Sequence, residues 1–221
     1  MNPCLVARPL FDPARLYYRD MLHRVCLCLA ILLSAGIGSS QVIEYESGGV
    51  KHQTLTRNGV TLNFATTHSH VRDYAMIQIA VANGSEVYAN IRPEDFTFIR
   101  ADGQTVRAAS ADDVVKDLLD RGSLGDVQKL VVAYENNLYG ISNMRITNGY
   151  EQRRRNAMAE GVPAKFKAAA AASALALVPT RLAPGQSTDG AVFFPMEHKL
   201  LGGGKLIVHS GNETYEFNAT Q

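Results

Sequence analysis

Alternating apolar and polar positions predict β-strands in two blocks of the chain, one before and one after a helical segment. In the first block, Val60, Leu62 and Phe64 recur at every second position, as in a strand with one buried face. The runs that predict strands are 60–65, 74–81, 87–91, 96–99, 177–178, 191–194, 205–209 and 214–219. The pattern therefore predicts about seven or eight strands, the last two of which form a hairpin.

Between the two blocks, the apolar spacing changes to that of an α-helix. Ser110 is suited to cap a first helix that stops at Gly122. Asp126 is suited to cap a second helix, which carries an apolar stripe and ends at Gly140. Few of the helical positions form such a stripe, so the helices are expected to pack on the strands rather than to fold alone.

A polar third helix is expected at 150–160, and an alanine-rich fourth helix after Pro163, so the helical insertion covers about 108–176. Residues 41–57 are polar and predict an irregular lead-in with at most one edge strand. Neither strand block alone can close a core. The pattern therefore predicts one mainly β domain over 58–221, a β-sandwich with a helical insertion.

Two stretches resemble a known family. Thr180–Pro195 reads TRLAPGQSTDGAVFFP, and the first block contains IQIAVAN at 77–83 and a phenylalanine strand before an Asp-Gly turn at 96–103. These elements resemble those of bacterial secreted immunoglobulin-like domains, and the helical insertion has no counterpart in the resemblance. The resemblance implies an immunoglobulin-like β-sandwich whose members mostly bind other molecules, but a fold alone does not assign a function.

The N-terminal segment predicts export. An uncharged apolar run covers 25–37, follows two basic residues and leads into small residues, which is the layout of a secretory signal peptide. Cleavage after Ser40 fits this layout, and Met21 is the better start of the signal, so that 1–20 is an upstream extension. The alternative is an uncleaved membrane anchor, for which the run is short. The expected location is periplasmic or extracellular.

The cysteines agree with this location. All three lie in the segment expected to be removed: Cys4, Cys26 and Cys28. The remaining chain would form no disulfide and offer no thiolate to a metal, which suits an oxidising compartment.

The amino-acid composition excludes few classes of function. The formal net charge of +1 argues against nucleic acid as a partner. His68 and His70 are two apart, so on a strand both imidazoles could face one metal, with Asp73 or His52 completing the site. The simpler interpretation is a pair of solvated loop histidines. The aspartates of the first helix are interpreted as its solvated face: Asp112, Asp113, Asp117 and Asp120.

One local concentration of positive charge lies in the helical insertion. It could contact an acidic protein or an anionic lipid surface, and the alternative is a solvated helix face. Tyrosines in the same insertion are of a type that interfaces favour. The candidate partner-binding residues are Tyr139, Tyr150, Arg153, Arg154, Arg155, Lys165 and Lys167.

These observations predict an exported, non-enzymatic binding or accessory protein of the cell envelope, with a protein or envelope component as partner and peripheral membrane contact as an option. No catalytic residue and no cofactor is expected. Two alternatives remain open: a metal-dependent hydrolase that uses His68 and His70, and a structural subunit of an envelope assembly.

Overall fold

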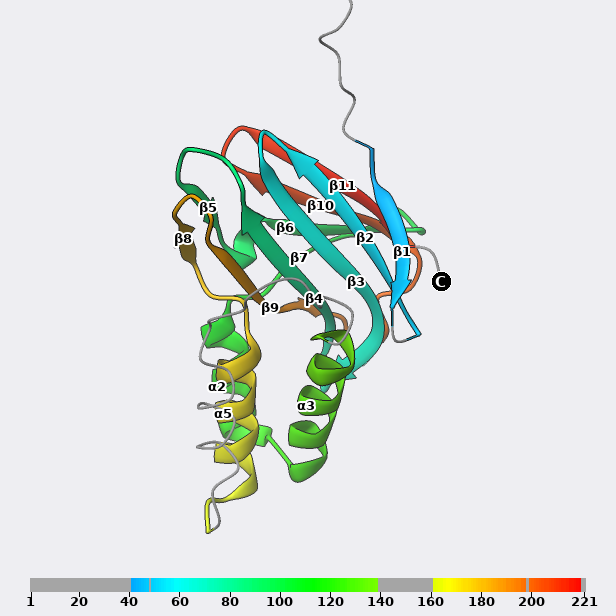
Figure 1. Ribbon diagram of the computed structural model, residues 1–221. Coiled ribbons are helices and arrows are strands. Elements are labelled where there is room, and N and C mark those ends of the chain that lie inside the picture. The colour runs from blue at the N-terminus through cyan, green and yellow to red at the C-terminus, as the bar shows by residue number, and fades with distance from the viewer. Residues whose placement is uncertain (1–40, 48, 139–160, 198, 220–221) are drawn as a thin grey trace, which may run out of the picture. The chain divides into compact units, whose positions relative to one another are not determined.

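The computed structural model describes residues 41–47, 49–138, 161–197 and 199–219, apart from the side chains of 66–68, 134 and 136–138 (Figure 1). The predicted signal peptide over 1–40 and the predicted helix at 150–160 lie outside these residues. All the described residues belong to one compact unit.

Two antiparallel sheets contain most of the strands (Figure 1). The large sheet has the order β1 (Ile43–Ser47), β2 (Val50–Arg57), β3 (Val60–Val71), β4 (Tyr74–Asn83), β9 (Ser187–Pro195). The small sheet has the order β11 (Glu213–Ala219), β10 (Gly204–Ser210), β6 (Phe96–Arg100), β7 (Thr105–Arg107). A separate pair joins β5 (Ala89–Ile91) to β8 (Thr180–Leu182), and a 3₁₀ turn, η1 (Pro93–Asp95), precedes β6.

The mainly β class is confirmed, and β10 and β11 form the predicted terminal hairpin. Three expectations were wrong. Residues 41–57 are not an irregular lead-in, because they form β1 and β2 of the large sheet. The described chain contains eleven strands rather than seven or eight. The run at 177–178 is not a strand, and the strand of that region is β8.

Both sheets contribute side chains to one apolar core. Alternation along β4 directs Ile77 and Ile79 into this core, where both are buried. The Phe64 ring of β3 contacts the Phe217 ring of β11, with their centroids 5.8 Å apart. The Phe98 ring of β6 likewise contacts the Phe194 ring of β9, with their centroids 6.1 Å apart. Aromatic side chains that face each other from two sheets thus fill the space between them.

The three described helices lie between β7 and β8 in the sequence: α2 (Ala111–Arg121), α3 (Leu124–Leu138) and α5 (Ala164–Leu175). They pack on the opposite face of the large sheet, near one end of β3, β4 and β9 (Figure 1). There Val71, Met76 and Phe193 join the buried residues of the helices in a second apolar cluster. This face is called the outer face below.

The helix ends follow their local sequence. Ser110 caps α2 as predicted, accepting a hydrogen bond from the Asp113 backbone N–H at 3.1 Å. The prediction that Asp126 caps the next helix was wrong, because α3 begins two residues earlier, at Leu124. The Asp126 carboxylate instead accepts hydrogen bonds from the Ser123 N–H and hydroxyl, at 2.9 and 2.8 Å. The Asp126 backbone N–H in turn donates to the Ser123 hydroxyl at 3.3 Å, which completes the reciprocal arrangement of a capping box.

Candidate functional site

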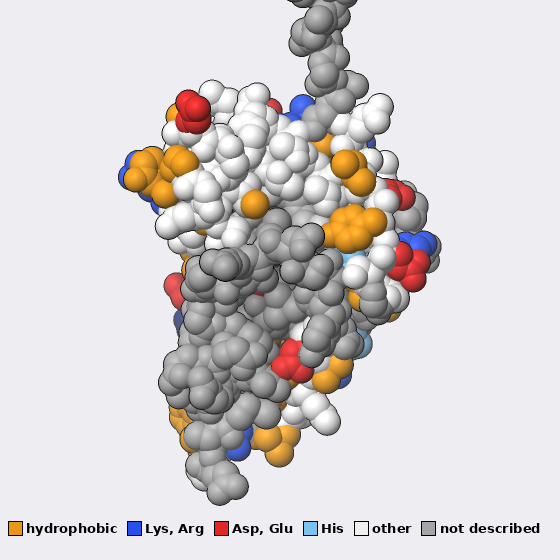
Figure 2. Space-filling model, viewed as in Figure 1, with side chains coloured by type: hydrophobic (Ala, Val, Ile, Leu, Met, Phe, Trp, Pro, Cys, Tyr) orange, Lys and Arg blue, Asp and Glu red, His pale blue; other side chains and the backbone are white. Residues whose placement is uncertain are grey.

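The outer face of the large sheet has two different halves. Under the helices it is apolar, as expected for a packed surface. Beyond them it carries buried polar side chains, which are rare unless hydrogen-bonded. Four of the seven buried polar or charged residues among the described side chains lie there: His52, Asn63, Gln78 and Asp189. Where the space-filling view from this side shows described residues above the helices, most of the surface is white, the colour of uncharged polar side chains and backbone (Figure 2).

The strand register places these residues in two neighbouring rows. The first row is Tyr45, His52, Ala65, Gln78 and Ala191, each opposite the next across adjacent strands. The second row is Ile43, Thr54, Asn63, Ala80 and Asp189. We call them the polar rows. Residues from five strands, far apart in the sequence, thus share one surface.

The Asn63 amide determines which nitrogen of His52 carries a proton. Its nitrogen donates to the Tyr45 hydroxyl at 2.5 Å and to the Thr54 hydroxyl at 2.9 Å. Its oxygen therefore faces His52 Nδ1, at 3.2 Å, and accepts the hydrogen bond. His52 is thus protonated on Nδ1, and Nε2 carries a lone pair.

Burial keeps the His52 ring neutral. The side chain is fully buried, and the Tyr45 ring stacks on it with centroids 5.0 Å apart and planes 10° apart. Burial lowers the pKa of His52, and the hydrogen bond with Asn63 raises this pKa by a smaller amount. Nε2 has no hydrogen-bond partner among the described residues.

Gln78 presents a second unpaired acceptor. Its amide nitrogen donates to the Asp189 carboxylate at 3.1 Å, and both side chains are buried. Its oxygen Oε1 is buried without a hydrogen-bond partner in the described part of the chain. A buried polar atom left unpaired costs about 1–3 kcal/mol, so the polar rows retain two acceptors at the expense of stability.

The pKa shift of His52 predicts a dependence of stability on pH. An unfolded histidine takes up a proton below about pH 6.5, whereas the folded ring, because its pKa is lowered, takes one up only at a lower pH. The unfolded chain then binds more protons, so the free energy of unfolding should fall as the pH drops from 7.5 to 5.5. Urea denaturation at both pH values measures this. His52→Phe should reduce the fall, and His209→Phe, at an exposed position, should not; equal falls in the two variants would contradict the assignment.

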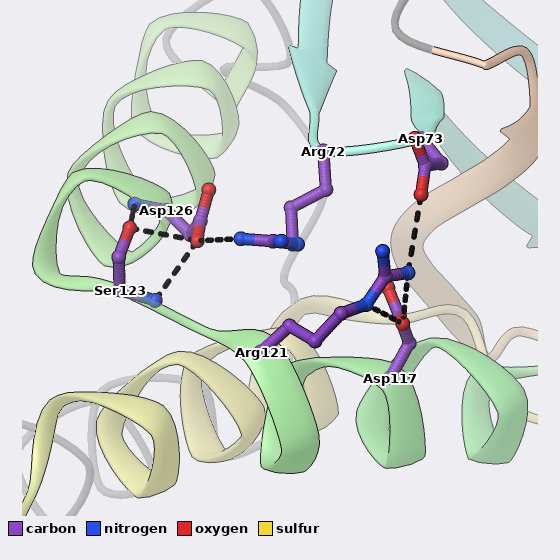
Figure 3. Close-up of polar contacts among 6 residues, drawn as sticks. All are labelled: Arg72, Asp73, Asp117, Arg121, Ser123 and Asp126. Atoms are coloured by element: carbon purple, nitrogen blue, oxygen red, sulfur yellow. Dashed lines mark hydrogen bonds and ion pairs between the residues drawn. The ribbon is translucent and has the colours of Figure 1, made fainter.

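A charged network attaches the helices to the end of the sheet (Figure 3). Arg72, which adopts a left-handed backbone with φ of 49° in the β3–β4 turn, donates to Asp126 of α3 at 3.3 Å. The neighbouring Asp73 accepts from Arg121 of α2 at 3.1 Å, and Arg121 also pairs with Asp117. Asp117 is thus an ion-pair partner rather than part of a wholly solvated face.

The candidate metal site is not assembled among the described side chains. The side chain of His68 is outside them, and His70 lies opposite Ala75 of β4. Asp73 pairs with Arg121 and His52 with Asn63, so the two proposed additional ligands have other partners. In the part of the chain that is described, no group of three or more His, Cys, Asp or Glu could hold a metal ion.

Most of the predicted partner-binding residues cannot be placed. Tyr139, Tyr150, Arg153, Arg154 and Arg155 lie outside the described residues. Lys165 and Lys167 lie on α5, and the Lys165 ammonium is 5.7 Å from the centroid of the half-exposed Phe166 ring. No helix among the described residues is long and apolar enough to cross a membrane.

Sequence reasoning missed the polar rows. It weighed His52 only as a metal ligand, and it read Asn63 as a solvent-facing position of an alternating strand. The available signal was the presence of two amide residues, Asn63 and Gln78, within runs that predict strands.

Comparisons with known proteins identify no relative of this chain. No protein-family model, no curated protein and no solved structure matches the chain.

Proposed function

We propose that this protein is exported to the cell envelope and acts there as a non-enzymatic binding protein, with the polar rows as its binding surface. The proposed scaffold is an immunoglobulin-like β-sandwich. It is supported by the antiparallel sheets that share one core and by the resemblance at 77–83, 96–103 and 180–195.

The single observation that carries the binding function is the pair of buried acceptors of the polar rows that have no hydrogen-bond partner among the described residues, His52 Nε2 and Gln78 Oε1. A fold gains nothing from retaining such atoms, because apolar side chains of similar size would avoid their desolvation cost. A ligand that donates hydrogen bonds explains their presence. A rigid sheet also positions such groups more accurately than a loop.

Export is tested by expressing the chain from Met21 in a bacterial host and identifying the N-terminal peptide of the protein by mass spectrometry. The expected product is found in the envelope fraction and begins at Gln41, as cleavage after Ser40 requires. A cytoplasmic product that retains the apolar run at 25–37 would contradict the proposal.

Envelope binding is tested by sedimenting the purified chain from Gln41 with isolated cell-wall sacculi and membrane vesicles. The double variant His52→Phe/Gln78→Met should sediment at least tenfold less, since it removes both acceptors and keeps similar shapes. The matched control is His209→Phe/Gln104→Met, whose two positions are exposed. Equal sedimentation of both double variants would refute the polar rows as the binding surface.

The same assay tests the basic surface predicted from the sequence. If Lys165→Glu/Lys167→Glu abolishes sedimentation and the His52/Gln78 variant does not, the helical insertion is the binding surface instead.

A further inference from the structure

The two unpaired atoms of the polar rows have the same chemical character. Gln78 uses its amide nitrogen to donate to Asp189, so the atom left over is its oxygen. His52 uses Nδ1 toward Asn63, so the atom left over is the lone pair of Nε2. Both are therefore acceptors, and the group that complements them must be a donor.

The spacing of the two residues along the first polar row leaves room between their Cα atoms for a ligand about the size of one sugar ring. His52 and Gln78 lie opposite the same residue, Ala65, one strand away on each side. Their Cα atoms are therefore about 10 Å apart, twice the distance between neighbouring strands. Ala65 offers only a methyl group between them, so two long side chains flank a short one.

The surrounding groups favour an uncharged ligand. The His52 ring is neutral, and in the polar rows Tyr45, Thr54 and Asn63 add only hydroxyl and amide groups. The rows contain no lysine or arginine, so they offer no cation to a phosphate, sulfate or carboxylate. Their one charged member, Asp189, accepts the Gln78 amide.

The Tyr45 ring covers one face of the His52 imidazole. It stacks on the imidazole, is 37% exposed, and belongs to the edge strand β1, which pairs within its sheet only with β2. An edge strand opens more easily than a central one, because fewer hydrogen bonds and contacts hold it. An aromatic ring with a polar tip also suits a ligand that has apolar C–H faces and hydroxyl edges.

We infer that the polar rows bind an uncharged, hydroxyl-rich ligand, a carbohydrate, whose hydroxyl groups donate to His52 Nε2 and Gln78 Oε1 when the Tyr45 ring moves aside. This inference rests on the binding function proposed above and adds the chemical class of the ligand. No bond is made or broken, because the site recognises the ligand by hydrogen bonds alone.

The test uses nuclear magnetic resonance on the chain from Gln41 with 15N-labelled histidine. The probes are N-acetylglucosamine, glucose and a soluble chitooligosaccharide, with methylammonium, guanidinium and inorganic phosphate as charged probes. At least one sugar should saturably shift the His52 Nε2 resonance upfield, since that nitrogen accepts a new hydrogen bond, and should leave the His209 resonances in place. The charged probes should shift neither.

The variants His52→Phe and Gln78→Met should each bind the sugar at least tenfold more weakly, measured by titration calorimetry. His209→Phe and Gln104→Met are the matched controls and should bind as the native protein does. The resonance experiment needs no variant, so it decides the inference even if a substitution prevents folding.

The outcomes separate the ligand class from the function. If the protein sediments with envelope fragments through the polar rows but no sugar shifts His52 Nε2, the carbohydrate inference is wrong and the binding function stands. A shift caused by methylammonium or guanidinium alone would reassign the ligand to a cation and overturn the inference. Sugar binding unaffected by His52→Phe and Gln78→Met would show that the site lies elsewhere.

Discussion

Phe217→Ala is expected to lower the free energy of unfolding by about 3–5 kcal/mol, the usual effect of removing a buried phenylalanine ring. Phe217 of β11 is completely buried and meets Phe64 of the large sheet. Its removal would leave a cavity at the place where the two sheets meet. The surrounding strands could close it only by moving one sheet against the other, so little of the loss would be recovered. Chemical denaturation of the chain from Gln41 measures the change.

Phe166→Ala is the matched control, because the same substitution is made at a ring that is 48% exposed on α5. It should cost less than about 1 kcal/mol, as surface changes usually do. If the two variants lose similar stability, the shared core of the two sheets is not the main source of the folding free energy.

Gly204→Ala has the second largest expected effect, a loss of about 2–3 kcal/mol from overpacking. A Cβ on Gly204 would lie 2.3 Å from the backbone oxygen of Ile99 and 2.7 Å from the Phe98 ring. Both neighbours belong to β6, which pairs with β10 at this point. Backbone atoms of a paired strand cannot move aside cheaply, so the sheet must shift or the ring must leave its position in the core.

Gly203→Ala, one residue earlier, tests the same substitution without the collision, because the nearest atom to its Cβ would be 3.6 Å away. The melting temperatures of the two variants should differ clearly, and that of Gly203→Ala should be close to the melting temperature of the native protein. Two equal melting temperatures would mean that β10 does not lie against β6 as described.

The strands that were predicted well are those in which one face is apolar along the whole run. β3 alternates at Val60, Leu62 and Phe64, and β11 at Tyr215 and Phe217. Burial of one face and exposure of the other produces this pattern directly, so a short window of sequence is enough to detect it.

The strands β1 and β2 were missed because buried apolar positions are too few in them to form a pattern: β1 has no buried residue, and Leu55 is the one buried apolar residue of β2. His52 and Gln53 are both buried in β2, and a pattern rule reads both as solvent-exposed. Gln53 is compatible with burial because its amide nitrogen donates to the backbone oxygen of Asn218, at 2.6 Å. That partner is 165 residues away in the sequence, so no local rule could anticipate it.

The charged network at the sheet end was missed for a similar reason. From the sequence, Asp117 was interpreted only as part of the solvated face of its helix, and its position four residues before Arg121 allows no more than a local ion pair. Their contact with Asp73 depends on where α2 packs against the β3–β4 turn.

The sequence by itself determined where most strands, the two ends of α2 and the mainly β class would be found, because each depends on neighbours within a few positions. Only the tertiary structure decided which polar residues are buried and with whom they pair. Alternation indicates that a strand has two different faces, but it does not indicate what covers the second face. The register across β1 to β4 and β9 brings His52, Asn63, Gln78 and Asp189 together, and register is a property of several strands at once.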